Sequence, residues 1–303
     1  MGRIKIFVPN HLTGFFEICN GTSLLKTGSR GAGVCITKGV LTEITIQSSN
    51  ENNIEVFING NKDERAKVTL YVVNYYLKEL KDVFYYIKIN HTIDLPIGNG
   101  FGASGAGALG ASFALNLLFN LNKTRNECAQ IAHMAEVYNK TGLGDIIAQT
   151  FGGAEIRTEP GAPGYGELDN ILVLPNLKVV CFSIGRIDTN SVIGNDIYKN
   201  NINNAGHLLV KELLKNPSIS NLMRLSYKFA QESNLMPKEI WDILKKLHSR
   251  GYDDSSMVML GKSLFCIVDQ SNVKKVVDII KKSSSSGKLF IADIDSQGAR
   301  IIG

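Results

Sequence analysis

The sequence predicts an α+β fold of two domains, and three observations support this prediction. In both halves of the chain, segments typical of helices lie beside runs typical of antiparallel strands, which favours α+β over a doubly wound sheet. The densest cluster of proline and glycine, residues 158–166, separates the two halves. The length of 303 residues suffices for two moderate domains. We therefore predict domains at residues 1–165 and 166–303.

The first half is predicted to contain strands and three helices. The strand-like segments span residues 4–8, 15–19, 31–47, 54–59 and 85–93. Apolar residues recur at spacings of three and four from Val68 to Leu80, which predicts a helix. Residues 106–121 are apolar nearly all round and predict a buried helix. Thr124 and Glu127 then form a capping box, which opens a helix that ends near Tyr138.

The second half repeats the mixture of strands and helices. The predicted strands span residues 170–174, 178–184, 263–268 and 289–294. The predicted helices span residues 218–232, 238–249 and 272–282. Pro237 stands near the start of the second of these helices, where its fixed backbone angle suits the first turn.

Composition excludes several classes of function. The net charge of +5 suits an anionic ligand, but no run of lysine and arginine is dense enough to predict a nucleic-acid partner. The five cysteines are scattered without metal-binding spacing, so we expect reduced thiols in a cytoplasmic protein and no zinc. Residues 4–8 predict a strand and not a signal peptide, and no apolar stretch approaches the ~18 residues that span a bilayer. We therefore expect no membrane partner.

A glycine-rich segment is the feature most informative about function. Gly98, Gly100, Gly102, Ser104 and Gly105 lie within eight residues, and a predicted helix follows at once. Glycine allows positive backbone φ and lets N–H groups approach an anion without a Cβ in the way. Free N–H groups and the positive end of the helix dipole then favour phosphate. The segment therefore predicts a loop that holds nucleotide phosphates.

Three other interpretations compete for glycine motifs in this chain. Gly261-Lys262-Ser263 ends like a Walker A loop, but the first glycine of that motif would fall at Ser256. Residues 100–105 fit the dinucleotide pattern GxGxxG, yet a second strand carrying an acid about 20 residues further on is missing. The third interpretation is a glycine turn that only packs tightly on a neighbour.

Acidic and basic residues near this segment have a structural and a functional interpretation. Asp145 is either the N-cap of a short helix or a carboxylate that orients an attacking hydroxyl. His133 and Glu136 lie three apart on one helix, as a surface ion pair or as a substrate contact and a Mg²⁺ ligand. Arg30 and Arg157 are either solvated surface groups or bidentate clamps for a carboxylate.

The arrangement of these motifs resembles the GHMP kinases. Residues 96–106 resemble the phosphate loop of that superfamily, and residues 142–153 resemble the segment that carries its catalytic aspartate. The opening segment, residues 8–16, is similar to the first motif, and residues 256–265 are the counterpart of the third, with only Gly261 left of its glycines. Within the superfamily, residues 9–16, 28–34, 141–145 and 160–164 together with Arg157 are most similar to the archaeal pantoate kinases.

The resemblance implies a fold and an activity. The fold would be the two-domain GHMP architecture, with a first domain like the second domain of ribosomal protein S5 and a ferredoxin-like second domain. The activity would be the ATP-dependent phosphorylation of pantoate to 4-phosphopantoate, on the route to coenzyme A. The alternatives are another small-molecule kinase, of homoserine, mevalonate or a related hydroxy acid, or a regulator that binds ATP without catalysis. A homodimer is among the assemblies that the superfamily implies.

The resemblance also implies roles for single residues. Asp145 would position the substrate hydroxyl for in-line attack on the γ-phosphorus, and Ser104 and Glu136 would coordinate Mg²⁺. The substrate carboxylate would be bound by Ser29, Arg30, His133 and Arg157. The triphosphate would be held by Pro96, Gly98, Gly100, Gly102, Ala103, Ser104, Gly105 and Ala106.

Overall fold

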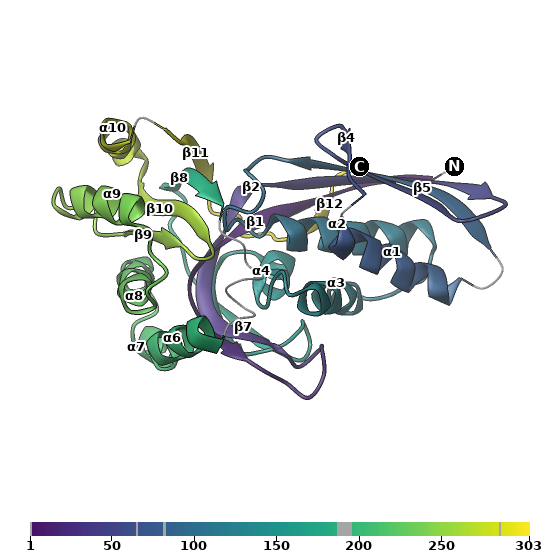
Figure 1. Cartoon of the computed structure of the whole chain (residues 1–303), viewed down its shortest axis with the longest axis horizontal. Helices are drawn as coiled ribbons and strands as arrows, with labels where there is room; N and C mark the ends of the chain where they lie inside the picture. The colour runs from purple at the N-terminus through teal and green to yellow at the C-terminus, as the bar shows by residue number, and fades with distance from the viewer. Residues whose placement is uncertain (1, 65, 81–82, 187–195, 285) are drawn as a thin grey trace.

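The computed structural model of the chain describes residues 2–64, 66–80, 83–186, 196–284 and 286–303. It contains two sheets with helices packed against them (Figure 1). The larger sheet has the strand order β12-β1-β2-β5-β3-β4, and β6 and β7 extend it from β2. The smaller sheet has the order β11-β8-β10-β9. Mixed layers of this kind confirm the predicted α+β class.

Two long strands form the backbone of the larger sheet. β1 (Gly2–Cys19) and β2 (Gly28–Ser49) pair antiparallel along almost their whole length and curve together toward the second unit (Figure 1). The sequence predicted two strands where β1 is one. Register shifts between Pro9 and Asn10 and between Thr13 and Phe15 interrupt the pairing without ending it. Such bulges bend a strand and re-aim its side chains, which is why they are frequent beside functional sites.

The remaining strands of this sheet come from distant parts of the chain. They are β3 (Asn53–Ile58), β4 (Asn61–Lys62), β5 (Phe84–Ile93), β6 (Ala154–Glu159), β7 (Glu167–Ile171) and β12 (Arg300–Ile301). The strand predicted at residues 170–174 is therefore β7, which begins earlier and ends at Ile171. β7 pairs with β6 and β12 pairs with β1, so residues beyond position 165 also belong to this sheet. The division of the chain at residues 165 and 166 stays a prediction.

Helices α1 to α4 lie on one side of the larger sheet (Figure 1). They are α1 (Lys67–Glu79), α2 (Ala103–Leu118), α3 (Arg125–Asn139) and α4 (Asp145–Phe151). The predicted capping box of α3 is present, with Thr124 accepting from the Glu127 N–H. The buried helix α2 begins three residues before its predicted start, which places Ser104 in its first turn. Apolar residues of α1, α2 and the sheet share one core, as the all-round apolar pattern predicted.

The second unit has the ferredoxin-like topology that was predicted. Its strands are β8 (Leu177–Arg186), β9 (Ser255–Val258), β10 (Gly261–Asp269) and β11 (Lys288–Asp293). In chain order the sheet reads fourth, first, third and second strand, with antiparallel neighbours throughout. Its helices are α6 (Asp196–Gly206), α7 (Leu209–Lys215), α8 (Ile219–Glu232), α9 (Lys238–His248) and α10 (Val273–Ser283), with the 3-10 turn η1 (Gln270–Asn272) before the last. The sequence did not predict α6 and α7.

One core joins the second unit to the far half of β1. Phe16 of β1 packs against Phe229 of α8 with ring centroids 5.7 Å apart, and both side chains are buried. Phe15 belongs to the same cluster as Phe265 of β10. Burial of several aromatic side chains across this boundary stabilises the arrangement of the two units. Among the helices in the described part of the chain, none has the length and apolar character needed to cross a bilayer.

Candidate active site

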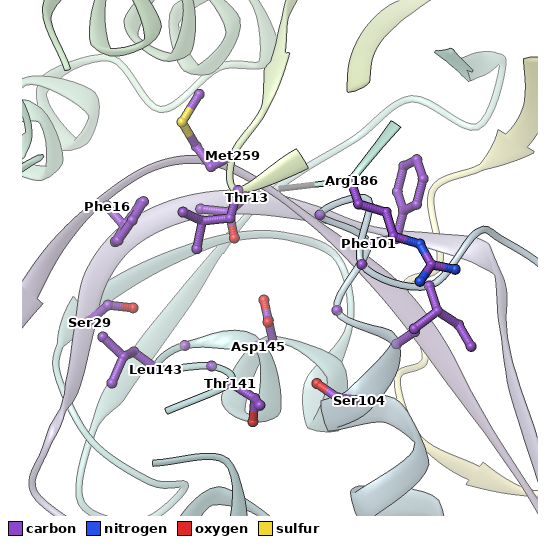
Figure 2. Close-up of a pocket in the computed structure, with 18 residues that line it drawn as sticks. Thr13, Phe16, Ser29, Phe101, Ser104, Thr141, Leu143, Asp145, Arg186 and Met259 are labelled. Atoms are coloured by element: carbon purple, nitrogen blue, oxygen red, sulfur yellow. The ribbon is translucent and has the colours of Figure 1, made fainter. Parts of the chain in front are cut away.

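A cavity of about 410 Å³ lies where the glycine-rich loop, α4 and the second unit meet (Figure 2). Its walls come from β1, from residues 98–104, from residues 141–145 and from Met259 and Leu260. A second cavity of about 540 Å³ lies beside it, near the start of α1 and the end of α3. The two cavities share Ile97, Ala103, Ser104 and Thr141 in their linings. The glycine-rich loop therefore separates two spaces, each large enough for part of a ligand.

The glycines of the loop have the backbone conformation that their spacing predicted. Gly98, Gly100 and Gly102 have φ angles of 80°, 88° and 63°, which side chains rarely tolerate. Gly102 is the N-cap of α2, and no side chain caps this end. The first N–H groups of an α-helix have no partner within the helix. The start of α2 therefore presents N–H groups and the positive dipole end to the boundary between the two cavities.

Side chains of the larger sheet and of α4 donate hydrogen bonds to the backbone of this loop. The Asn10 amide donates to the carbonyl oxygen of Phe101 at 2.5 Å, and the Gln149 amide donates to that of Gly102 at 2.8 Å. Asn10 follows the first proline of the opening motif, and its hydrogen bond holds the loop backbone. Neither contact was predicted from the sequence.

The smaller sheet also forms hydrogen bonds with this loop. Asn99 donates to the hydroxyl of Ser183 at 2.5 Å, and the Ser263 hydroxyl donates to the Asn99 carbonyl oxygen at 2.9 Å. All three residues are buried. A Cβ added at Gly261 would lie 1.9 Å from that same carbonyl oxygen, so a side chain there is incompatible with the present loop. The one glycine left in the third motif is therefore required by contact with the phosphate loop.

Asp145 is the first residue of α4 and lines the first cavity. Gly144 is the N-cap, so the interpretation of Asp145 as the N-cap of this helix is wrong. The Asp145 side chain is 22% exposed, and its Oδ1 lies 2.7 Å from Nδ1 of His11. A Cβ added at Gly142 would lie 3.3 Å from Oδ2, and one at Gly102 would lie 3.5 Å from it. One oxygen is thus bound to protein while the other faces the glycine walls of the cavity.

Glu136 lies directly behind this wall. Its side chain is buried, and its Oε1 accepts a hydrogen bond from the Thr141 hydroxyl at 2.7 Å. Its Oε2 has no hydrogen-bond partner among the described residues. Burial and the charge of Asp145 raise the pKa of Glu136 to about 7, against the opposing effects of Thr141 and Ser104. A cation beside Ser104 would give the buried Oε2 the partner that it lacks.

The four residues expected to bind a carboxylate are placed differently from one another. Ser29 lines the first cavity, whereas the other three do not. Arg30 is paired with Glu17 at 3.1 Å. The ring of His133 is buried, with Nε2 donating to the carbonyl oxygen of Thr27 at 2.8 Å, and burial lowers its pKa.

Arg157 lies behind the cavity wall. Its guanidinium is buried and forms an ion pair with Glu155, two residues earlier on β6. A Cβ added at Gly144 would lie 2.7 Å from Arg157 Nε and 2.3 Å from the Ser29 hydroxyl. Arg157 Nε and Nη2 have no hydrogen-bond partner among the described residues. The side chain therefore adjoins Ser29 through Gly144 and has two nitrogens whose N–H groups lack acceptors among the described residues.

Two members of the site, His11 and Glu155, were not predicted from the sequence. Both are buried, and His11 lies between Asp145 and Glu155. Alternation of Glu155 and Arg157 with apolar neighbours resembles a strand with one solvated face. β6 is instead paired on both edges, by β2 and β7, and its residues 154–157 are all buried. Glu155 and Arg157 carry opposite charges and lie two residues apart, so both point to the same face of the strand. This pattern was the signal in the sequence that could have identified a buried ion pair.

Arg186 is a third residue that sequence patterns did not reveal. It ends β8, is exposed, and lines the first cavity on the side of the glycine-rich loop (Figure 2). A Cβ added at Gly98 would lie 3.2 Å from its Cδ, so its aliphatic part covers that glycine. Among the described residues that line this cavity, Arg186 is the cation. The adjoining cavity contains Lys67 and Lys140 in its lining.

Comparisons with known proteins agree with this geometry. The family model of the GHMP kinases N terminal domain matches residues 67–153. The chain is 38% identical over 280 residues to a pantoate kinase of Thermococcus kodakarensis, covering 91% of each. It is 37% identical over 276 residues to a pantoate kinase of Methanocaldococcus jannaschii, covering 91% of this chain and 97% of that one. A solved phosphotransferase related to the CoA biosynthesis pathway superposes with a TM-score of 0.90 at 35% identity, covering 99% of this chain and 98% of the other.

Proposed function

The chain belongs to the GHMP kinase family, whose members are ATP-dependent, and from this premise we propose that it phosphorylates pantoate. The γ-phosphoryl group of ATP would pass to the terminal hydroxyl of pantoate and give 4-phosphopantoate and ADP, a step of coenzyme A biosynthesis. The observation that carries this proposal is the likeness to two pantoate kinases over 91% of this chain. It coincides with a cavity in which a phosphate loop and a carboxylate face each other.

The triphosphate would lie across the boundary between the two cavities. The backbone of residues 98–106 and the start of α2 supply N–H donors there, and Arg186 supplies a positive charge beside Gly98. The nucleoside would occupy the larger cavity, which lies on the other side of Ser104 and Ala103. The acceptor would occupy the cavity that contains Asp145. This assignment brings the γ-phosphoryl group and the acceptor hydroxyl together at the loop.

Asp145 would act on the acceptor hydroxyl. Its Oδ1 is held by His11, so Oδ2 is the oxygen that remains for the substrate. The hydroxyl would donate its hydrogen bond to Oδ2, lose its proton there as the new P–O bond forms, and displace ADP in line. Phosphoryl transfer depends mainly on placement and neutralisation of charge, so these few groups are sufficient.

Glu136 and Ser104 fit a magnesium site. Mg²⁺ usually binds one or two carboxylates together with substrate phosphates, and a hydroxyl is a suitable additional ligand. The buried Oε2 of Glu136 lacks a partner, and Ser104 stands at the start of α2 where the phosphates would pass. Bound there, Mg²⁺ would neutralise charge on the β- and γ-phosphates. Glu136 would bind it as the carboxylate, which requires loss of the proton that its raised pKa favours.

The carboxylate of pantoate would lie on the Ser29 side of the cavity. Ser29 can donate directly, and Arg157 adjoins it behind Gly144 with two nitrogens, Nε and Nη2, that lack acceptors among the described residues. His133 and Arg30, which have partners on other segments, would support the shape of this wall without reaching the cavity. The five cysteines are free thiols, which is the state that the reducing cytoplasm maintains. We therefore propose that the reaction takes place in the cytoplasm. The homodimer stays a prediction for sedimentation analysis.

Coupled ADP release tests the substrate directly. The purified chain should release ADP with pantoate and ATP·Mg²⁺, and homoserine, mevalonate and glycerate should give at least tenfold lower kcat/KM. Phosphorus NMR of the product should show a phosphate monoester on the primary hydroxyl. A higher kcat/KM for another acid would replace pantoate as the substrate. ATP binding without ADP release from any of these acids would favour the non-catalytic regulator.

A further inference from the structure

The ring of His11 forms hydrogen bonds with two carboxylates at once. Nδ1 lies 2.7 Å from Asp145 Oδ1, and Nε2 lies 2.7 Å from Glu155 Oε1. The ring is completely buried, so water does not compete for either nitrogen. An ionised carboxylate only accepts hydrogen bonds, whereas neutral imidazole donates from one nitrogen only. The two short contacts are therefore satisfied together when both nitrogens of His11 carry a proton.

We propose that His11 is a permanent imidazolium that positions Asp145 for phosphoryl transfer, with Glu155 as the second carboxylate that supports its charge. This inference rests on the proposed function, because it assigns a role toward the catalytic carboxylate. His11 does not line the cavity, so it acts through Asp145 and is a positioning residue. By binding Oδ1, it leaves Oδ2 facing the glycine walls.

The surroundings of His11 balance its charge. Asp145 on α4 and Glu155 on β6 are the two anions, and Arg157 on β6 is the second cation, with Nη1 3.5 Å from His11 Nε2. Thr13, on the same strand as His11, has its hydroxyl 3.4 Å from Nδ1. Two anions and two cations give the cluster no net charge. A neutral His11 would leave it with a net negative charge beside the triphosphate, which would repel the substrate.

Burial alone would disfavour the charged ring. Desolvation lowers the pKa of His11, but hydrogen bonds and charges of Asp145 and Glu155 outweigh it, so that the pKa is raised. A buried charge is tolerated when it is paired and its hydrogen bonds are satisfied. Both conditions hold for His11 in this cluster.

Glycines on β2 leave the space that the side chains of this cluster occupy. A Cβ added at Gly33 of β2 would lie 2.5 Å from His11 Nε2 and 3.0 Å from Glu155 Oε1. One added at Gly31 would lie 2.8 Å from Arg157 Nη2. The bulge in β1 between Pro9 and Asn10 immediately precedes His11 and sets the direction of its side chain. The glycines of β2 and the bulge in β1 thus make room for charged side chains behind the cavity.

Nitrogen NMR of the wild-type protein tests the charge of His11 without using its activity. The ring nitrogens of His11, one of five histidines, should both show the imidazolium shift from pH 6 to pH 8.5. His11→Gln removes this signal and so assigns it. In Glu155→Gln, loss of one anion should lower the midpoint of the imidazolium transition into the measured range. A neutral ring in the wild-type protein at pH 7 would overturn the proposal.

Kinetics test the positioning role. His11→Gln should lower kcat about 100-fold and change KM for ATP less than threefold, because the loss is in orientation of the base. His11→Lys keeps a cation beside Asp145 and should recover at least tenfold over His11→Gln. His207→Gln is the matched control, since His207 is 63% exposed and does not line the cavity. Equal kcat for the Gln and Lys variants, both folded by circular dichroism, would overturn the positioning role.

The two proposals fail in distinguishable ways. A doubly protonated His11 in a protein that phosphorylates none of the tested acids would contradict the proposed function and leave the charged cluster standing. Phosphorylation of pantoate by a protein with a neutral His11 would do the reverse.

Discussion

The carbonyl oxygen of Asn99 lies against Gly261 so closely that a Cβ on Gly261 would be 1.9 Å from it. Asn99 belongs to the phosphate loop and Gly261 opens β10 of the second unit. The loop is therefore fixed by contact with a part of the chain that is about 160 residues away, as the hydrogen bond between Asn99 and Ser263 also shows. The position of the loop therefore depends on both units.

Gly261→Ala should displace the loop. We expect KM for ATP to rise at least tenfold, because backbone atoms cannot move aside as the end of a flexible side chain would. The measurement is steady-state kinetics with ATP as the varied substrate. Gly185→Ala is the control: its Cβ would make ordinary contact with Lys262, 3.4 Å away, on the same pair of strands. An unchanged KM in Gly261→Ala would show that the loop position is not critical.

Asp145→Asn should abolish turnover and leave nucleotide binding intact. The amide keeps the size of the side chain but is a poor proton acceptor, so kcat should fall about 10³-fold. The dissociation constant for ATP, measured by calorimetry, should stay within threefold. Asp278→Asn on α10 is the control, because this residue lies outside both cavities. Near-normal turnover of Asp145→Asn would remove this carboxylate from the reaction.

Glu136 should make magnesium binding depend on pH. Its pKa of about 7 in the folded protein exceeds that of the unfolded chain, so folding takes up a proton between pH 4.5 and pH 7. The metal-free protein therefore loses stability as pH rises from 4.5 to about 7, and the full loss is present above that pH. Glu136→Gln should raise Tm at pH 8 by several degrees without Mg²⁺ and should lose the stabilisation that Mg²⁺ with an ATP analogue gives the wild type. A lower Tm in the variant would contradict this account.

Arg186→Ala should weaken the interaction with the triphosphate. We expect kcat/KM for ATP to fall between tenfold and 100-fold, and Arg186→Lys to recover part of the loss, because a point charge replaces a planar guanidinium. The tested quantity is the ratio of kcat/KM for ATP to that of the wild type. Arg250→Ala, at an exposed position after α9, should leave it unchanged. Equal values for Arg186→Ala and Arg250→Ala would exclude Arg186 from the site.

Arg157→Ala should affect stability as well as substrate binding. It removes one of the two cations that pair with the buried Glu155 and leaves the cluster with a net negative charge. Loss of one partner of a buried pair typically costs about 3–5 kcal/mol. Chemical denaturation measures this loss. The surviving folded protein should show a larger rise in KM for pantoate than for ATP, since Arg157 adjoins Ser29. Arg30→Ala, which breaks a more exposed pair with Glu17, is the control and should change stability by less than about 1 kcal/mol.

Features encoded by neighbouring residues could be predicted from the sequence. The glycine spacing identified the loop, the apolar pattern identified α2, and Thr124 with Glu127 identified the start of α3. Each of these depends on contacts within a few residues. α6 and α7 were not predicted.

Features created by long-range strand pairing could not be predicted in the same way. His11 meets Asp145 across 134 residues and Glu155 across 144, and no local pattern indicates such contacts. Of the two interpretations of Arg157, the solvated surface group was wrong for the same reason, because β6 lies between β2 and β7 and its residues 154–157 are buried. Arg186 enters the cavity through the placement of the second sheet.

The pairing of β12 with β1 has a consequence for biosynthesis. Ile6 of β1 pairs with Ile301 of β12, so β12 is synthesised about 295 residues after the strand that it covers. The edge of the larger sheet beside β1 therefore stays open during translation, with its N–H and C=O groups able to attract other strands. We expect nascent chains that lack residues 300–301 to depend on chaperones until this edge is closed.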